Sequence, residues 1–360
     1  MIDGEVRVAI VGVGNCASSL VQGVAHYAAN PENDIGLMHR TVGPYDVSSI
    51  RFVAAFDVAT AKVGTDLSQA IFAGSNCTDR FAEVPYQDVT VVQAPRLDGY
   101  GTRYAEKVEA VDAPEDMAAM VDHLVATQAN VVVNYLPVGS EIAVRWWAEA
   151  ARRAGCGFVN AIPVKIANDP VEAKKFKDAG LPVVGDDIKS QFGATIVHRV
   201  LAKLVEDRGL RLLRTYQLNV GGNMDFYNML EQSRLASKKE SKRTAVTRNM
   251  VNPPAENDVH IGPSDFVPWL GDHKLAFIRL ECEAFGGVPL TLELRMDVVD
   301  SPNSAGVVID AVRACKLAMD RGESGPVEGC SSWLFKSPPV NHADEDAQRI
   351  FEKWASEDQN

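Results

Sequence analysis

The chain has 360 residues, of which 46% are hydrophobic and 23% charged, the balance of a globular enzyme and not of a disordered or fibrous chain. This length exceeds what one hydrophobic core usually organises, so we expect two domains. The formal net charge of −12 opposes non-specific attraction to nucleic acid and to anionic membranes, because both are polyanions. Neither kind of partner is therefore expected.

The cysteines and the first residues indicate a reducing compartment. The six cysteines are scattered without a Cys-x-x-Cys pair, so neither a disulfide framework nor a metal site is predicted. The start, Met-Ile-Asp-Gly-Glu-Val-Arg, carries acids where a signal peptide needs a basic segment and an apolar run. No stretch approaches about 18 uninterrupted apolar residues, the length of a membrane-spanning helix. The expected location is the cytoplasm.

The first half of the chain alternates strand-like and helix-like segments. Residues 6–11 form an apolar run that suits a central parallel strand, and residues 15–29 suit a helix. Further strand-like runs lie at 51–56, 89–93, 129–134, 157–160 and 181–185, with helical stretches at 114–127 and 141–154. This alternation predicts an α/β fold with a Rossmann-like, doubly wound parallel sheet. The segment 30–49, rich in Pro, Gly, Asn and Asp, is expected to be an inserted surface loop.

The pattern changes after Lys189. A helix at 194–207 leads into a strand-like run at 210–220, and later runs at 277–281 and 290–296 alternate in polarity, as exposed antiparallel strands do. Asp300-Ser-Pro-Asn-Ser304 has turn chemistry that can cap a helix at 305–319, which is expected to return to the first domain. The chain therefore divides into a Rossmann part at 1–199, an inserted α+β domain at 200–298 and a return at 299–360.

The first strand is followed by a glycine-rich turn that is typical of dinucleotide-binding sites. Gly12-Val-Gly14-Asn-Cys-Ala17 joins this strand to a helix, and that context gives the weak Gly-x-Gly-x-x-Ala pattern its value. Gly12 allows a tight turn, Gly14 leaves room for the pyrophosphate, and the helix N-terminus offers free N–H groups to the phosphates. A plain strand-to-helix turn is the alternative.

Asp57 ends the second predicted strand, where an acid would bind the adenosine ribose and repel a 2′-phosphate. This position favours NAD over NADP. Asp57 lies 43 positions after Gly14 instead of the usual ~20, and the inserted loop at 30–49 accounts for the excess.

Four lysines stand out by their neighbours: Lys238, Lys242, Lys274 and Lys336. Lys238 and Lys242 are four positions apart, so on a helix they share a face and repel each other unless an anion lies between them. A solvated basic face explains them equally well. A nucleic-acid patch is disfavoured because aromatic residues are not interleaved with these lysines and the protein is acidic.

Two loops could face a substrate. Gly185-Asp-Asp-Ile-Lys-Ser190 follows a strand at the edge where α/β proteins bind ligands, so Asp187 or Lys189 could lie there. Asn219-Val-Gly-Gly-Asn-Met-Asp225 is dense in small and amide residues that suit sugar hydroxyls, although it could be a plain loop. No hydrolase signature occurs.

Taken together, six segments resemble the inositol-phosphate synthase family, especially its short actinobacterial type. They are Gly12-Val-Gly-Asn-Cys, Asn134-Tyr-Leu-Pro-Val-Gly-Ser140, Gly185-Asp-Asp-Ile-Lys-Ser190, Asn219-Val-Gly-Gly-Asn-Met-Asp225, Ser237-Lys-Lys-Glu-Ser-Lys242 and Asp300-Ser-Pro-Asn-Ser304. The resemblance runs from about Val6 to Pro339. It implies a Rossmann domain with an inserted α+β domain that is catalytic and forms a homotetramer. It also implies NAD-dependent conversion of glucose 6-phosphate to an inositol monophosphate by oxidation, enolisation, aldol closure and reduction.

The resemblance assigns roles to individual residues. It makes Asp187, Lys238, Lys242, Lys274 and Lys336 catalytic. It assigns cofactor binding to Gly12, Gly14, Asn15, Cys16, Asp57, Ser140, Asp187, Asp300 and Asn303, and substrate binding to Ser190, Thr195, Asn219, Asp225 and Lys242. Ammonium groups suit this chemistry because negative charge develops on sugar oxygens during enolisation and ring closure. Lysines clustered in a closed site are expected to have lowered pKa values, so that one could also carry a proton.

Two charged residues depart from the family pattern. Glu240 lies between Lys238 and Lys242, where the family usually has an aliphatic residue, and Lys165 stands where we expect an apolar one. They leave open a branch that cyclises another sugar phosphate, such as fructose 6-phosphate to a five-membered ring. A simple NAD-dependent dehydrogenase and an NAD-binding regulatory protein are the rival functions.

Overall fold

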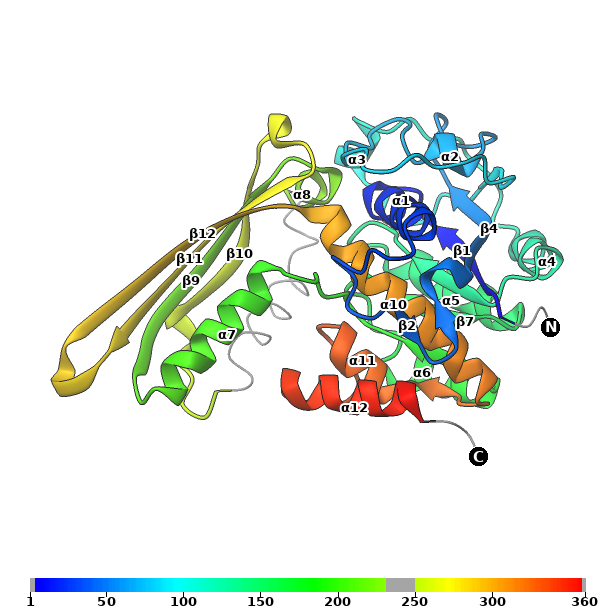
Figure 1. Cartoon of the computed structure of the whole chain (residues 1–360). Coiled ribbons are helices and arrows are strands. Elements are labelled where there is room, and N and C mark those ends of the chain that lie inside the picture. Colours follow the sequence, from blue (N-terminus) through cyan, green and yellow to red (C-terminus); the bar gives the residue numbers. More distant parts are fainter. Residues whose placement is uncertain (1–3, 231–249, 358–360) are drawn as a thin grey trace.

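The computed structural model describes residues 4–230 and 250–357, and its larger unit is built on a parallel sheet (Figure 1). The sheet runs in the order β13-β8-β7-β6-β1-β4-β5, and all its strand pairs are parallel. Its strands are β1 (Val6–Val11), β4 (Ile50–Asp57), β5 (Val91–Gln93), β6 (Val131–Asn134), β7 (Gly157–Asn160), β8 (Pro182–Val184) and β13 (Gly325–Pro326). The predicted doubly wound α/β fold is confirmed.

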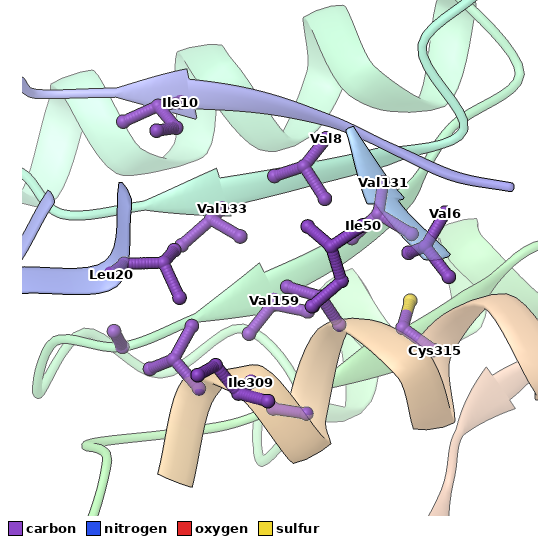
Figure 2. Close-up of a cluster of buried hydrophobic side chains, with 14 of the residues drawn as sticks. Val6, Val8, Ile10, Leu20, Ile50, Val131, Val133, Val159, Ile309 and Cys315 are labelled. Atoms are coloured by element: carbon purple, nitrogen blue, oxygen red, sulfur yellow. The ribbon is translucent and has the colours of Figure 1, made fainter. Parts of the chain in front are cut away.

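Helices cover both faces of this sheet, because alternate residues of its strands pack against opposite layers. Val6, Val8 and Ile10 of β1 pack with α1 (Asn15–Ala29) and α10 (Asp300–Asp320), as Figure 2 shows for Leu20, Ile309 and Cys315. Ala9 and Val11 pack on the other face, in a cluster with α4 (Met117–Ala126), α5 (Glu141–Arg153) and α6 (Pro170–Asp178). Full burial on both faces explains why these strands read as continuous apolar runs.

A second sheet projects from this unit and is built from long strands (Figure 1). It runs in the order β10-β9-β11-β12, with β9 (Arg211–Gly221), β10 (Val259–Phe266), β11 (His273–Glu283) and β12 (Pro289–Val299). α7 (Ala194–Asp207) lies along one face and shares a buried cluster with the strands. The predicted antiparallel pair at 277–281 and 290–296 is confirmed as the centres of β11 and β12. The strand β10, which pairs in parallel with β9, was not predicted.

The shorter elements lie at the edges of these two units. They are the helices α2 (Leu67–Ala70), α3 (Thr102–Ala105), α8 (Met224–Met229), α11 (Glu328–Leu334) and α12 (Asp344–Ser356), the strands β2 (Thr41–Val42) and β3 (Tyr45–Asp46), and the 3₁₀ turns at 47–49, 256–258, 268–270 and 285–287. Among the described residues, no helix is long and apolar enough to cross a membrane.

Helix α10 begins earlier than the sequence predicts. Asp300 to Ser304 form its first turn instead of a separate capping turn. Pro302 is compatible with that position, because the N–H groups of a first helical turn have no partner within the helix. The helix passes from the second sheet into the core of the parallel one and packs on α1 and β7.

The inserted loop is more ordered than its composition indicates. It contains the β2–β3 hairpin, and the fully buried Arg313 of α10 holds it in place. This guanidinium donates to the carbonyl oxygens of His39, Arg40 and Tyr45 and pairs with Asp310 at 2.5 Å. A long-range buried cation, which no local pattern reveals, therefore fixes the segment.

His39 makes the anchoring of this loop dependent on pH. Its Nδ1 lies 2.6 Å from Asp310 Oδ2, and this hydrogen bond raises the pKa of the imidazole above its usual 6.5; Glu352 of α12 faces Nε2 at 3.8 Å. A raised folded-state pKa contributes stability that is complete below 6.5 and is lost as the pH rises through the folded value. The melting temperature of a His39→Gln variant should therefore fall furthest below wild type near pH 6 and approach it in alkali.

The control for this comparison is His260→Gln, which changes an exposed histidine on β10. If the melting temperature of the His39 variant lies below wild type by the same amount at every pH, the role of the imidazolium is contradicted.

Candidate active site

A large cavity opens where the parallel sheet meets the second sheet, at the carboxyl ends of β1 and β4. Its empty volume is about 1740 Å³, including the open mouth. The lining comes from the turn after β1, residues 94–100, the end of β6, α8, β11 and the start of α10. Carboxyl ends of parallel strands are where doubly wound proteins bind ligands, so this cavity is the candidate active site.

The glycine-rich turn is held so tightly that position 12 admits only glycine. Gly12 has φ +91°, and a Cβ built on it would lie 2.8 Å from the carbonyl oxygen of Tyr135. Gly14, by contrast, has φ −88°, and its Cβ would meet no atom within 4 Å. The first glycine is thus required by the fold, whereas the second faces open space in the cavity wall.

The carboxylate of Asp57 stabilises this turn through hydrogen bonds to backbone N–H groups. It accepts the backbone N–H of Val13, Val58 and Ala59, each at 2.8 Å. A carboxylate has about four lone-pair sites, so capacity for a further donor remains. The buried ammonium of Lys62 lies 3.8 Å from Asp57 and donates to the Val13 carbonyl at 2.7 Å.

The helices α1, α5 and α7 begin beside the cavity, and they are capped differently. α1 begins after Gly14 and α7 after Gly193, and neither N-cap residue provides a side-chain hydrogen bond. At α5, Asp98 accepts the N–H groups of Ile142 and Ala143, each at 2.8 Å. A helix N-terminus without a side-chain cap is an anion-binding position. α1 and α7 therefore have N–H groups available for anions, whereas an internal carboxylate fills α5.

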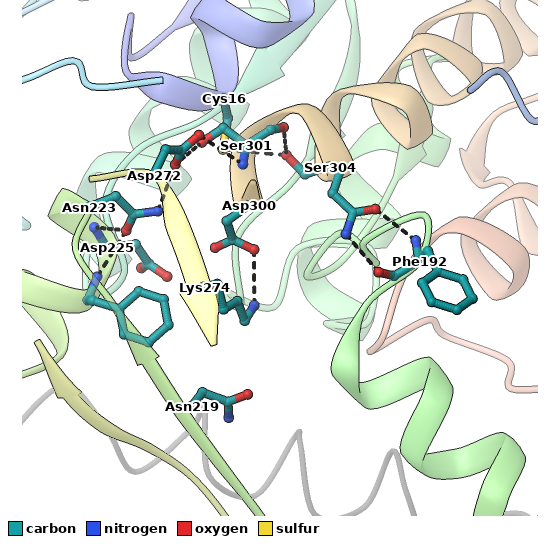
Figure 3. A network of polar contacts seen from close by, with 12 residues as sticks. Cys16, Phe192, Asn219, Asn223, Asp225, Asp272, Lys274, Asp300, Ser301 and Ser304 are labelled. Carbon is teal, nitrogen blue, oxygen red and sulfur yellow. Dashed lines mark hydrogen bonds and ion pairs between the residues drawn. The ribbon is translucent and has the colours of Figure 1, made fainter. Parts of the chain in front are cut away.

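The second sheet contributes Lys274 to the cavity. Its ammonium donates to Asp300 Oδ1 at 3.1 Å, across the junction between β11 and α10 (Figure 3). Behind this pair, the buried Asp272 accepts the Ser301 hydroxyl at 2.8 Å and the Asn223 amide at 3.0 Å. Asp272 thus ties the start of α10 to the N-cap of α8, the helix that carries Asp225.

The electrostatics of Lys274 correct an expectation from the sequence. Burial disfavours its charged form, but Asp300, Asp225 and Asp187 outweigh burial, so the pKa of the ammonium is raised. The expected lowering is wrong for this lysine because it faces carboxylates. Lys274 therefore stays protonated at neutral pH and is suited to stabilise negative charge.

Lys336 and Asp187 form a second ion pair in the cavity wall, with Nζ 2.9 Å from Oδ1. Their segments lie side by side, because Ile188 and Phe335 form an antiparallel bridge and Lys336 N donates to the Asp187 carbonyl at 2.7 Å. Asp187 has φ +62°, a strained conformation for a non-glycine residue that is common at functional sites. The bridged segments 186–189 and 334–337 are called the catalytic ribbon below.

Polar side chains at the ends of three neighbouring strands support this ribbon. The Asn134 amide donates to Asn160 at 2.8 Å, and the Asn160 amide donates to Asp186 at 2.8 Å. Asp186 also accepts the backbone N–H groups of residues 166, 167 and 168. Burial raises the pKa of Asp186 to about 6, although these hydrogen bonds oppose the shift.

The structure brings together most of the residues singled out in the sequence. Those that line the cavity are Gly12, Gly14, Asn15, Cys16, Asp57, Asp187, Ser190, Asp225, Lys274, Asp300 and Lys336. Lys238, Glu240 and Lys242 lie outside the described residues. Lys165 is exposed and does not line the cavity, and of the pair Asp187 and Lys189 only Asp187 faces it.

Four further candidates do not line the cavity. The Ser140 hydroxyl donates to the Pro137 carbonyl at 2.6 Å beneath Gly99. Asn303 bonds both backbone groups of Phe192, each at 2.8 Å, and so positions the loop before α7. Thr195 lies in the first turn of α7, and the buried Asn219 donates to the Gly262 carbonyl at 2.8 Å.

Sequence reasoning missed several polar residues of the site: Lys62, Asp98, Tyr135 and Asp272. Tyr135 lines the cavity, and within the described part of the chain its buried hydroxyl has no hydrogen-bond partner. Asp272 adjoins the lysine segment and could have been noticed there. Lys62 and Asp98 act on backbone atoms far away in sequence, for which no pattern exists.

Comparison with known proteins agrees with this geometry. A family model described as myo-inositol-1-phosphate synthase matches residues 193–301. The chain is 60% identical over 358 residues to inositol-3-phosphate synthase of Mycolicibacterium smegmatis, covering 98% of each chain. It is 55% identical to inositol-3-phosphate synthase of Corynebacterium glutamicum, covering 99% of this chain and 100% of the relative.

Solved structures share the fold over the whole length. A myo-inositol-1-phosphate synthase-related protein from Thermotoga maritima aligns with TM-score 0.82 at 25% identity, and the protein Ari2 aligns with TM-score 0.81 at 31% identity. Each alignment covers 98% of both chains. With nearly full-length identity of 55–60% to curated relatives, the chain belongs to the inositol-phosphate synthase family.

Proposed function

We propose that the protein converts glucose 6-phosphate to an inositol monophosphate, with NAD as a cofactor that is regenerated in each cycle. The observation that carries this proposal is the joint lining of one cavity by the dinucleotide turn and the Lys274–Asp300 and Lys336–Asp187 pairs. One acid or base beside the cofactor would suffice for a simple dehydrogenase, and an NAD-binding regulatory protein would need no ammonium groups fixed in its cavity. The names of the similar inositol-3-phosphate synthases support the same substrate class.

The residues of the turn fit NAD. The cradle at Gly12 and Gly14 leaves space for a pyrophosphate at the N-terminus of α1, and Asp57 keeps capacity for a ribose hydroxyl. The Tyr135 hydroxyl offers a buried donor and acceptor without a partner in the described part of the chain. Bound NAD would supply a hydride acceptor and later return the hydride. Asn15, Cys16 and Asp300 line the same wall, and Ser140 supports it through Pro137, whereas Asn303 acts on the loop before α7.

Two of the three lysines that line the described cavity, Lys274 and Lys336, provide the electrostatic part of catalysis. Lys274 and Lys336 enter from different elements, β11 and the catalytic ribbon, so they can bind different oxygens of one sugar. Each is oriented by a carboxylate, which removes the need for water to reorganise when charge develops on an oxygen. We assign Lys274 and Lys336 to the oxygens of the redox and aldol chemistry, and Asp187 to orienting Lys336.

The N-terminus of α7 is the proposed phosphate position. Ser190 lines the cavity just before this helix, and Thr195 lies in its first turn. A Cβ at Gly193 would come within 2.7 Å of the Ser190 side chain, so this approach requires glycine. Phosphate is favoured there by free N–H groups and the helix dipole. The resemblance adds Lys242 to the phosphate, Lys238 to a developing alkoxide, and Asn219 and Asp225 to the sugar hydroxyls.

We also propose that the inserted domain at 200–298 forms a homotetramer, as the family resemblance implies. The support is the exposed side of β12, where residues 289–291 and then Glu293, Arg295 and Asp297 are exposed, together with the partly exposed Phe277 of β11.

Substitution of Gly12 is expected to affect folding, whereas substitution of Gly14 is expected to affect cofactor binding. Gly12→Ala should lower the melting temperature, because the new Cβ meets the Tyr135 carbonyl and φ is positive. Gly14→Ala should leave the melting temperature unchanged but weaken NAD binding about tenfold or more, because its methyl group occupies the pyrophosphate side. Calorimetry of NAD binding and thermal unfolding measure both effects. Unchanged NAD affinity of the Gly14 variant would contradict the assignment.

Removal of either ammonium group should remove stabilisation of the transition state. Lys274→Met and Lys336→Met should each lower kcat by about 10²- to 10³-fold, the usual effect of losing one preorganised donor, with NAD binding retained. Lys174→Met, on the exposed surface of α6, is the matched control. Full turnover of either cavity variant would show that its lysine has no catalytic role.

Product analysis tests the function itself. Glucose 6-phosphate and fructose 6-phosphate are incubated separately with enzyme and NAD, with products followed by NMR and NADH by absorbance. We expect inositol monophosphate from glucose 6-phosphate without NADH accumulation. Stoichiometric NADH would identify a dehydrogenase, and a five-membered cyclitol phosphate from fructose 6-phosphate would identify the alternative branch. NAD binding without any product would identify a regulatory protein.

A further inference from the structure

The C-terminal helix α12 contacts the back of the proposed phosphate site through one carboxylate. Asp344, the first residue of α12, lies 3.3 Å from Lys189 Nζ and 2.5 Å from an Arg199 guanidinium nitrogen. Lys189 belongs to the catalytic ribbon, and Arg199 belongs to α7. Both cations are nearly buried, with side chains 10% and 11% exposed. One acid of the tail therefore joins two elements of the active site.

Lys189 transmits this contact to the cavity wall. Its ammonium also donates to the carbonyl oxygens of Ser332 and Trp333, each at 2.9 Å, and so caps the C-terminal end of α11. Its neighbours Ile188 and Ser190 line the cavity, and its backbone N–H donates to Leu334 within the ribbon. Asp344 supplies the only carboxylate among these three acceptors, so it is the one that balances the charge of the Lys189 ammonium.

Arg199 transmits the contact to α7. It lies four residues after Thr195, one turn further along the same helix face. Its Nε is buried and has no partner in the described part of the chain, so its fixed charge depends on Asp344. An arginine cannot lose its proton in a protein. Without Asp344 this guanidinium must move towards water, and the start of α7 would move with it.

We propose that Asp344 is a positioning residue for the sugar-phosphate substrate, holding Ser190 and the N-terminus of α7 in place through Lys189 and Arg199. The carboxylate touches neither substrate nor cofactor and acts only through these two cations. The role rests on the proposed function, because it assumes that a phosphate binds at α7.

The test compares Asp344→Asn with Asp346→Asn in the full-length enzyme. Asp346→Asn is the matched control, since it removes the same charge from the same helical turn, and among the described residues the ion pair of Asp346 is with the exposed Arg349. Asp344→Asn should raise KM for glucose 6-phosphate about tenfold, within the range found for residues that act through a neighbour. Its kcat and its affinity for NAD should stay within twofold of wild type, and the control should match wild type throughout.

Chemical rescue separates positioning from general stability. In an Asp344→Ala variant, formate should restore a low KM by taking the place of the carboxylate, whereas chloride at equal ionic strength should not. An unchanged KM would overturn the role of Asp344. So would a rise in KM that comes with equally large losses of NAD affinity and melting temperature and that formate does not reverse. A wild-type enzyme that forms no product from either sugar phosphate would instead contradict the proposed function.

Discussion

The arrangement of the site depends on the burial of one helix, α10. It begins at the end of β12 beside Lys274 and then passes under the parallel sheet, where nearly all its residues are buried. Burial of that much apolar surface fixes the position of the second sheet relative to the dinucleotide turn. Asp272 completes the joint by binding the N–H and hydroxyl of Ser301 at the first turn of the helix.

The junction formed by α10 and Asp272 explains why the charged side chains of the site occur in pairs instead of singly. Lys274 and Lys336 come from different elements, β11 and the segment 334–337, and each enters the cavity with a carboxylate beside it. Their partners keep the charges in fixed places before a substrate arrives. The same pairing raises the pKa of Lys274, which favours its charged form and suits it to stabilise negative charge.

The sequence predicts the parts of this structure that local chemistry determines. The dinucleotide turn is recognisable because strand, glycines and helix adjoin in the chain, and Lys274, Lys336 and Asp187 are recognisable by their segments. Asp98, Lys62 and Arg313 are not, because each acts on backbone atoms distant in sequence. Asp344 lies in an acidic tail without a recognisable sequence motif. Only the structure shows that it lies beside two nearly buried cations, Lys189 and Arg199.

The protein has a net charge of −12, although it is proposed to bind two phosphorylated molecules. The described cavity lining includes the carboxylates of Asp57, Asp98, Asp187, Asp225 and Asp300, so net charge does not attract these ligands. Attraction must be local. The N-termini of α1 and α7 lack side-chain caps at glycine positions, which offers N–H groups without adding a mobile cation. At α5, the Asp98 carboxylate already accepts the N–H groups of Ile142 and Ala143. Phosphate is therefore favoured at the N-termini of α1 and α7 and opposed at that of α5.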